Sequence, residues 1–311
     1  MVEKRGMAYR GPMEAYPGLE GFSQTIDLPG NKLRLFFYDS GGSREPAVLL
    51  IHGLGDEADT WRHLIEPLSS RWRVIAPDLP GFGRSEKPVR AYTLEFLQSC
   101  LFELLERLSI QQVILVGHSM GGMLAQSMAL EQPGMVKGLV LIDGGLLVQT
   151  QRLNPQLLIS LIPGIGEWHY TKLRKDPQEA YATLSAYYDD IKNLPQNERD
   201  FLYKRVNQRV WSDDQRRAYF STLRSMAASV PRMQKGLREQ LAGLKTATLI
   251  LWGEKDLINP LENSTALVQA QPNAQLVVIP QAGHMPHQEQ WKEVSETILS
   301  LSEVTGWQNA S

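Results

Sequence analysis

The sequence predicts an α/β fold: a mostly parallel twisted sheet with helices on both faces, interrupted by an all-helical insertion. Continuous apolar runs alternate with segments of helical spacing near both ends of the chain. Apolar runs of this kind are typical of parallel strands that are buried on both faces. Between Leu146 and Leu244 the alternation stops, and only helical patterns remain.

The strand and helix patterns can be placed along the chain. Eight strands are predicted, at 22–27, 32–38, 47–51, 73–77, 113–116, 139–142, 246–252 and 275–279. Five helices accompany them, at 61–69, 93–108, 120–130, 260–269 and 290–301, with Thr93 as an N-cap. Because crossovers in a parallel sheet are right-handed, we expect the carboxyl ends of these strands to share one edge.

The insertion divides the chain into three parts. Helical patterns cover 177–192, 198–210, 214–228 and 232–241, and Pro163, Pro195 and Pro231 punctuate them. We therefore expect residues 1–144 to form the first part of the core, 145–245 a helical insertion, and 246–311 the second part of the core.

The composition excludes several classes of protein. The chain has 311 residues, a formal net charge of -2 and one cysteine. This charge gives no electrostatic basis for binding nucleic acid, and a single cysteine excludes an internal disulfide and a cysteine-based metal cluster. Cys100 lies in an amphipathic pattern and is expected to be a buried thiol. With no leader-like start and no apolar run of about 18 residues, we expect no membrane span and a cytoplasmic protein, either a monomer or a homodimer.

One short stretch carries the main chemical signal. Gly117-His118-Ser119-Met120-Gly121 follows a buried strand and begins a helix, which is the context of a G-x-S-x-G nucleophile turn. Such a turn holds its serine in a strained backbone conformation and exposes the hydroxyl. We also expect strand and helix to approach so closely that a Cβ atom at Gly117 or Gly121 would collide.

A serine hydroxyl becomes a nucleophile when a base takes its proton, and histidine titrates in the right range. Of six histidines, His284 follows the last predicted strand, at the edge where Ser119 is expected. Asp256 follows the preceding strand, and the order Ser119, Asp256, His284 agrees with the chain order of serine triads that have this turn. Asp143 ends another strand and is the rival acid. For Asp78 we expect a structural role, bracing the loop at 80–83.

Taken together, these motifs resemble the α/β-hydrolase superfamily. The resemblance covers nearly the whole chain and rests on five segments: His52-Gly53-Leu54-Gly55, Asp78 to Ser85, Gly117 to Gly122, Gly253-Glu254-Lys255-Asp256 and Gly283-His284. It implies an oxyanion hole made by the backbone N–H groups of Leu54 and Met120. It also implies that the insertion is a lid over the substrate. Relatives that open epoxides or remove halide use an aspartate nucleophile, so Ser119 argues against both activities.

The expected activity is hydrolysis of carboxylic esters of moderately hydrophobic substrates through an acyl-enzyme on Ser119. Apolar and aromatic residues of the insertion favour this substrate class: Leu157, Leu158, Leu161, Ile162, Trp168, Tyr187 and Tyr188. The alternatives are a C–C bond hydrolase of ring-cleavage products, a cofactor-free perhydrolase, and a ligand-binding protein with little turnover. No dinucleotide fingerprint, P-loop or metal-binding spacing is present, so we expect no cofactor and no metal.

Overall fold

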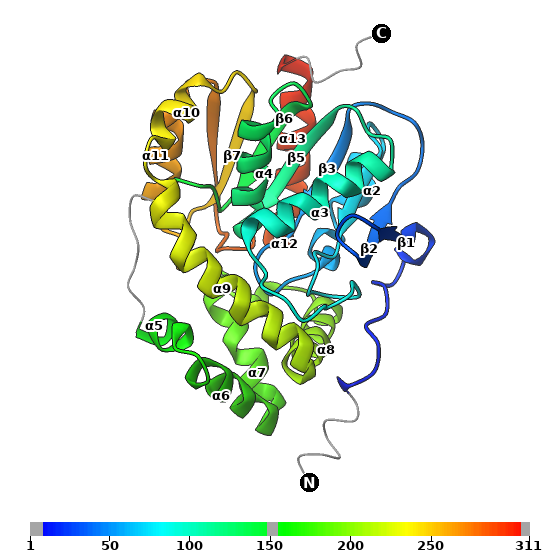
Figure 1. The fold of residues 1–311 in the computed structure, drawn as a ribbon, viewed down its shortest axis with the longest axis vertical. Helices are drawn as coiled ribbons and strands as arrows, with labels where there is room; N and C mark the ends of the chain where they lie inside the picture. Colours follow the sequence, from blue (N-terminus) through cyan, green and yellow to red (C-terminus); the bar gives the residue numbers. More distant parts are fainter. Residues whose placement is uncertain (1–8, 148–154, 306–311) are drawn as a thin grey trace.

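The computed structural model describes residues 9–147 and 155–305, except for the side chains of 155–157 and 301–305. One eight-stranded sheet runs through the molecule in the order β1-β2-β4-β3-β5-β6-β7-β8 (Figure 1). β1 pairs with β2, and β2 with β4, in antiparallel fashion, whereas all other neighbours are parallel. The predicted fold class is therefore confirmed.

The eight predicted strands are all present. They are β1 (Ser23–Leu28), β2 (Leu33–Asp39), β3 (Ala47–Ile51), β4 (Val74–Pro77), β5 (Val113–His118), β6 (Val136–Ile142), β7 (Thr248–Gly253) and β8 (Ala274–Ile279). The middle strands β3 and β5 are buried along their whole length. The continuous apolar runs in the sequence reflect this burial, because helices cover both faces.

Alternate residues of the strands belong to two separate cores. Leu49 and Ile51 of β3 lie in the core beneath α3 (Leu94–Arg107), α4 (Met120–Glu131) and α11 (Glu262–Ala270). Val48 and Leu50 lie in the opposite core, with α2 (Ile65–Ser69) and α13 (Trp291–Thr305). This two-residue period places the two layers of helices on either side of the sheet.

The helices of the core begin and end close to their predicted bounds, with two differences. Thr93 caps α3 as expected, accepting a hydrogen bond from the Phe96 N–H at 3.2 Å. The helix predicted over 61–69 is wrong in part, because a 3-10 helix, η3 (Ala58–Trp61), precedes the short α2. A short helix before α13, α12 (Pro286–Glu289), has no period long enough to be seen in the sequence.

Every described element between β6 and β7 is helical. The α-helices are α5 (Pro155–Leu161), α6 (Ile165–Lys172), α7 (Pro177–Ala182), α8 (Gln196–Trp211), α9 (Asp213–Met233) and α10 (Leu237–Gly243), and the 3-10 helices are η4 (Leu173–Lys175), η5 (Thr183–Tyr187) and η6 (Ile191–Asn193). Figure 1 shows α5 to α9 gathered beyond one end of the sheet. We call the residues from 155 to 243 the helical insertion.

Two predictions within the helical insertion are wrong, and two of its helices were not predicted. Pro231 does not separate two helices but lies inside α9, two residues before its end, so its missing N–H removes one hydrogen bond of the last turn and leaves the preceding turns intact. The helix predicted over 177–192 ends at Ala182 and continues as the 3-10 helices η5 and η6. The helices α5 and α6 were not predicted.

Cys100 is fully buried, as expected, and its burial raises the pKa of the thiol to about 12. A thiol with such a pKa stays protonated and unreactive near neutral pH.

None of the helices described is both long and apolar enough to cross a bilayer.

Candidate active site

Ser119 occupies a strained turn between β5 and α4. Its backbone φ is 53° and ψ is -117°, a conformation that side chains rarely adopt outside functional sites. A Cβ atom on Gly117 would lie 2.2 Å from the carbonyl oxygen of Gly121, and one on Gly121 would lie 2.0 Å from that of Ile51. The predicted collision at both glycines is therefore confirmed, and the close approach fixes the position of Ser119.

His284 and Asp256 come together at the carboxyl edge of the sheet. Asp256 follows β7, His284 follows β8, and Nδ1 of the histidine lies 2.7 Å from Oδ2 of the aspartate. Both side chains are at most 2% exposed. A proton on Nδ1 donates to the carboxylate, which leaves Nε2 of His284 as the proton acceptor of the ring.

The histidines nearest to this pair are held by other partners. Nε2 of His118 lies 2.7 Å from the carbonyl oxygen of His284, so it donates there, and the two rings are 4.9 Å apart. Nε2 of His287 contacts the Thr60 hydroxyl at 2.8 Å. Burial lowers the pKa of His118 to about 3 and that of His287 well below its ordinary value. Both rings therefore stay neutral beside His284.

His52 is a structural residue. Its Nδ1 donates to the carbonyl of Gly53 at 2.8 Å, and its Nε2 accepts from the N–H of Leu79 at 2.9 Å. These two bonds join the loop after β3 to the loop after β4. With both ring nitrogens occupied, His52 has none left to accept a proton.

Asp143 directly follows β6 and lies close to the Asp256–His284 pair. Its Oδ1 accepts from the N–H of Gly253 at 2.8 Å, while its buried Oδ2 has no hydrogen-bond partner among the described residues. A carboxylate oxygen of Asp143 and ring nitrogens of His118 and His284 all lie within 4.8 Å of one another. Asp256, rather than Asp143, makes the short contact with His284.

Among the described side chains, His118, Asp143 and His284 lie close enough together to bind a metal ion. Two of their nitrogens are already engaged, because Nδ1 of His284 bonds to Asp256 and Nε2 of His118 bonds to a carbonyl. The other ring nitrogen of His118, Nδ1, is buried and has no hydrogen-bond partner among the described residues.

Ser119 lies beside the loop after β3. A Cβ atom on Gly53 would be 3.3 Å from the Cβ of Ser119. Among the described residues, no hydrogen-bond partner contacts the Oγ of Ser119 or the N–H groups of Leu54 and Met120. The contact between Ser119 and His284 therefore stays a prediction, as does the oxyanion hole.

Asp78 braces the loop after β4, as predicted. Its carboxylate accepts from the N–H and the guanidinium of Arg84 and from the N–H of Ala58. Burial opposes ionisation, but the charge of Arg84 outweighs it and holds the pKa of Asp78 below its ordinary value. Asp78 thus stays charged and links the loops after β3 and β4.

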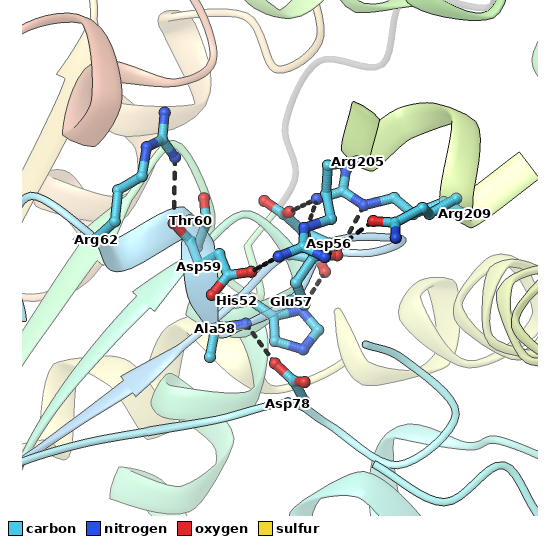
Figure 2. Close-up of polar contacts among 12 residues, drawn as sticks. His52, Asp56, Glu57, Ala58, Asp59, Thr60, Arg62, Asp78, Arg205 and Arg209 are labelled. Atoms are coloured by element: carbon cyan, nitrogen blue, oxygen red, sulfur yellow. Dashed lines mark hydrogen bonds and ion pairs between the residues drawn. The ribbon is translucent and has the colours of Figure 1, made fainter. Parts of the chain in front are cut away.

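A buried ion network connects the loop after β3 with α8 of the helical insertion. Arg209 forms ion pairs with Asp56 and Glu57, and Arg205 with Glu57 and Asp59. Figure 2 shows both arginines pointing into this acidic loop. Burial raises the pKa of Glu57, whereas Arg209 keeps that of Asp56 below its ordinary value despite burial.

The helical insertion also contacts the loop that carries His284. The ring of Tyr187 lies 5.9 Å from that of His284. One carboxyl oxygen of Glu289 accepts from the N–H of Gly283 at 2.8 Å, and the other accepts from the N–H of Asp189 at 2.7 Å. Glu289 therefore ties the insertion to the residue next to His284.

A family model described as the alpha/beta hydrolase fold matches residues 46–290, which is most of the chain. This match agrees with the sheet order, the strained serine turn and the helical insertion after β6. The chain belongs to the α/β-hydrolase fold family.

Two curated relatives and one solved structure illustrate what this α/β hydrolase is similar to. The uncharacterized hydrolase YugF of Bacillus subtilis is 31% identical over 93% of this chain and 99% of its own. A 2-hydroxy-6-oxononadienedioate/2-hydroxy-6-oxononatrienedioate hydrolase of Cupriavidus pinatubonensis is 26% identical over 89% of this chain and 93% of its own. The structure of a thermophilic esterase from Thermogutta terrifontis aligns with a TM-score of 0.71 at 26% identity, covering 91% of this chain and 98% of the esterase.

Two features of this hydrolase were not predicted from its sequence. The ion network was missed, although Asp56, Glu57 and Asp59 form an acidic run and Arg205 and Arg209 are spaced four residues apart on one helix. Glu289 was missed because its role depends on Asp189, which lies 100 residues earlier in the chain, as well as on Gly283, six residues before it.

The side chains expected to form an apolar pocket lie in different surroundings. Tyr188 is buried, and its hydroxyl donates to Gln288 at 2.9 Å. Leu158, Ile162 and Trp168 are between 48% and 58% exposed, and Leu157 falls outside the described side chains. Tyr187 remains the residue of this set whose ring faces His284.

Proposed function

We propose that this protein is a serine hydrolase that cleaves carboxylic esters through an acyl-enzyme on Ser119. The observation that supports it most is the buried 2.7 Å contact between Nδ1 of His284 and Oδ2 of Asp256, at the same edge of the sheet as the strained Ser119. A carboxylate in this position fixes the tautomer of the imidazole and stabilises its protonated form. These are the properties that a general base for a serine hydroxyl requires.

In the proposed reaction, Ser119 Oγ attacks the ester carbonyl while Nε2 of His284 accepts its proton. The N–H groups of Leu54 and Met120 bind the developing oxyanion, which is typically worth about 3–4 kcal/mol per donor. His284 then protonates the leaving alcohol, and an acyl-enzyme remains on Ser119. Water activated by His284 releases the acid and restores the serine.

Cleavage of a C–C bond is the second candidate. The relative from Cupriavidus pinatubonensis is named as a hydrolase of 2-hydroxy-6-oxo dienedioates, and its similarity extends over most of both chains. The esterase from Thermogutta terrifontis supports the first candidate to a similar extent. The same serine, histidine and aspartate would serve both reactions, so the substrate decides between them.

One substrate comparison tests both candidates. The purified protein is assayed with nitrophenyl esters of increasing acyl length and, in parallel, with a ring-cleavage dienone, using Ser119→Ala as the background for each. We expect turnover of the esters that depends on Ser119. Turnover of the dienone with little ester hydrolysis would favour the C–C hydrolase, and absence of both would reject the proposed function.

A further inference from the structure

Asp143 has an arrangement that the proposed reaction does not explain. Its backbone φ is 47°, in the left-handed region that aspartate adopts more readily than most residues other than glycine. Its side chain is fully buried, and Oδ1 is fixed by the N–H of Gly253. Its Oδ2 is also buried, but no described residue donates a hydrogen bond to it. A buried carboxylate oxygen without a donor is costly, whereas a protonated one can itself donate.

The groups around Asp143 show where such a proton would point. Asp256 follows the neighbouring strand, and Asn259 joins the two residues, because it donates to the backbone carbonyl of Asp143 and to Oδ1 of Asp256. His118 and His284 lie within 4.8 Å, and Glu289 adds a further acidic charge from α12. The charged neighbours of Asp143 are acidic, and the imidazole of His118 stays neutral. Ionising the Asp143 carboxyl would therefore place two carboxylates side by side. Burial and the charge of Asp256 accordingly raise the pKa of Asp143 well above its ordinary value.

We infer that Asp143 is a positioning residue that keeps a proton and donates it to Asp256, so that a neutral carboxylic acid holds the carboxylate that orients His284. The inference rests on the proposed function. It also implies a reserve role. When Asp256 cannot accept from His284, Asp143 lies close enough to the ring to ionise and take over as its acceptor.

The test uses a pair of isosteric variants and their combination. Asp143→Asn keeps a donor toward Asp256 and an acceptor for Gly253. In Asp256→Asn the amide oxygen stays at Oδ1, which accepts from the N–H groups of Ile258 and Asn259, so an NH2 group replaces the acceptor of His284. On a nitrophenyl ester we expect kcat to fall about threefold in Asp143→Asn and about a hundredfold in Asp256→Asn. In the double variant, kcat should be about thirtyfold lower than in Asp256→Asn, because the reserve acid is absent.

Two outcomes would overturn the inference. One is a double variant whose kcat is only about threefold below that of Asp256→Asn, because the two substitutions would then act independently. The other concerns the proton itself, which urea unfolding between pH 5 and 9 detects without any activity. The stability of wild type relative to Asp143→Asn should fall as pH rises, and parallel curves would show that Asp143 holds no extra proton.

This second measurement separates the inference from the proposed function. If the wild-type protein hydrolyses neither class of substrate, the proposed function fails, but the unfolding curves still decide whether Asp143 is protonated. Thermal unfolding of each variant, followed by circular dichroism, checks that a loss of kcat does not come from loss of the fold.

Discussion

Nδ1 of His284 lies 2.7 Å from Oδ2 of Asp256, although the two residues follow different strands and are 28 positions apart. This relationship predicts which acid supports the reaction. Asp256→Asn should lower kcat more than Asp143→Asn, because only Asp256 makes the short contact with the imidazole. The measurement is steady-state hydrolysis of a nitrophenyl ester by both variants. A larger loss in Asp143→Asn would make Asp143 the acid instead.

The strained turn predicts a strong effect of a single methyl group. In Gly121→Ala the new Cβ would lie 2.0 Å from the carbonyl oxygen of Ile51, so β3 and α4 would have to separate. We expect a loss of about 2–4 kcal/mol in the free energy of unfolding. Gly134→Ala is the matched control, since a Cβ there has no atom within 4 Å. Equal stability of the two variants in urea unfolding would contradict the close approach.

The ion network predicts a cost for removing one buried cation. Arg209→Met would leave Asp56 and Glu57 without their main partner, and breaking a buried ion pair from one side typically costs about 3–5 kcal/mol. Arg217→Met serves as the control, because Arg217 pairs with Asp214 in an exposed position where about 0.5 kcal/mol is expected. Chemical denaturation measures both. A small effect at Arg209 would show that the network contributes little.

The raised pKa of Glu289 predicts that the free energy of unfolding depends on pH. Its burial raises the pKa from 4.5 to about 7, so between these values the folded protein binds a proton that the unfolded chain releases. Stability from this group is therefore present below about pH 4.5 and is lost as pH rises to about 7. Glu289→Gln removes the titration, so its stability should decline less over this window.

Urea unfolding at pH 4.5, 5.5, 7 and 8 checks this, with the wild type and Glu289→Gln measured side by side. Glu254→Gln, at an exposed position on the neighbouring loop, is the control and should follow the wild type. If Glu289→Gln follows the wild type as well, the carboxyl does not titrate in this range.

The sequence was most informative where local pattern and tertiary environment agree. β3 and β5 are buried on both faces, so their apolar runs identify them without reference to the rest of the chain. Ser119, Asp256 and His284 could be placed at one edge because strand order and crossover handedness fix that edge. The short contact between Asp256 and His284 could not be read from the sequence, since it depends on how two loops fold back.

Elements that depend on distant partners were predicted less well. In the segment expected to be helical over 177–192, helical structure is interrupted after Tyr187, where Tyr188 bonds to Gln288 and the N–H of Asp189 bonds to Glu289, 100 residues further along the chain. The helix expected over 61–69 is replaced at its start by η3, where Trp61 is buried in the core. In both places tertiary contacts override a local preference for helix.

The central claim is that Ser119 is a nucleophile activated by His284. Labelling the intact protein with a fluorophosphonate probe, followed by mass spectrometry of its peptides, tests this claim most directly. We expect one adduct, on Ser119, with labelling lost in Ser119→Ala and strongly slowed in His284→Ala although both variants remain folded. An unlabelled wild-type protein, or an adduct on another residue that persists in Ser119→Ala, would contradict it.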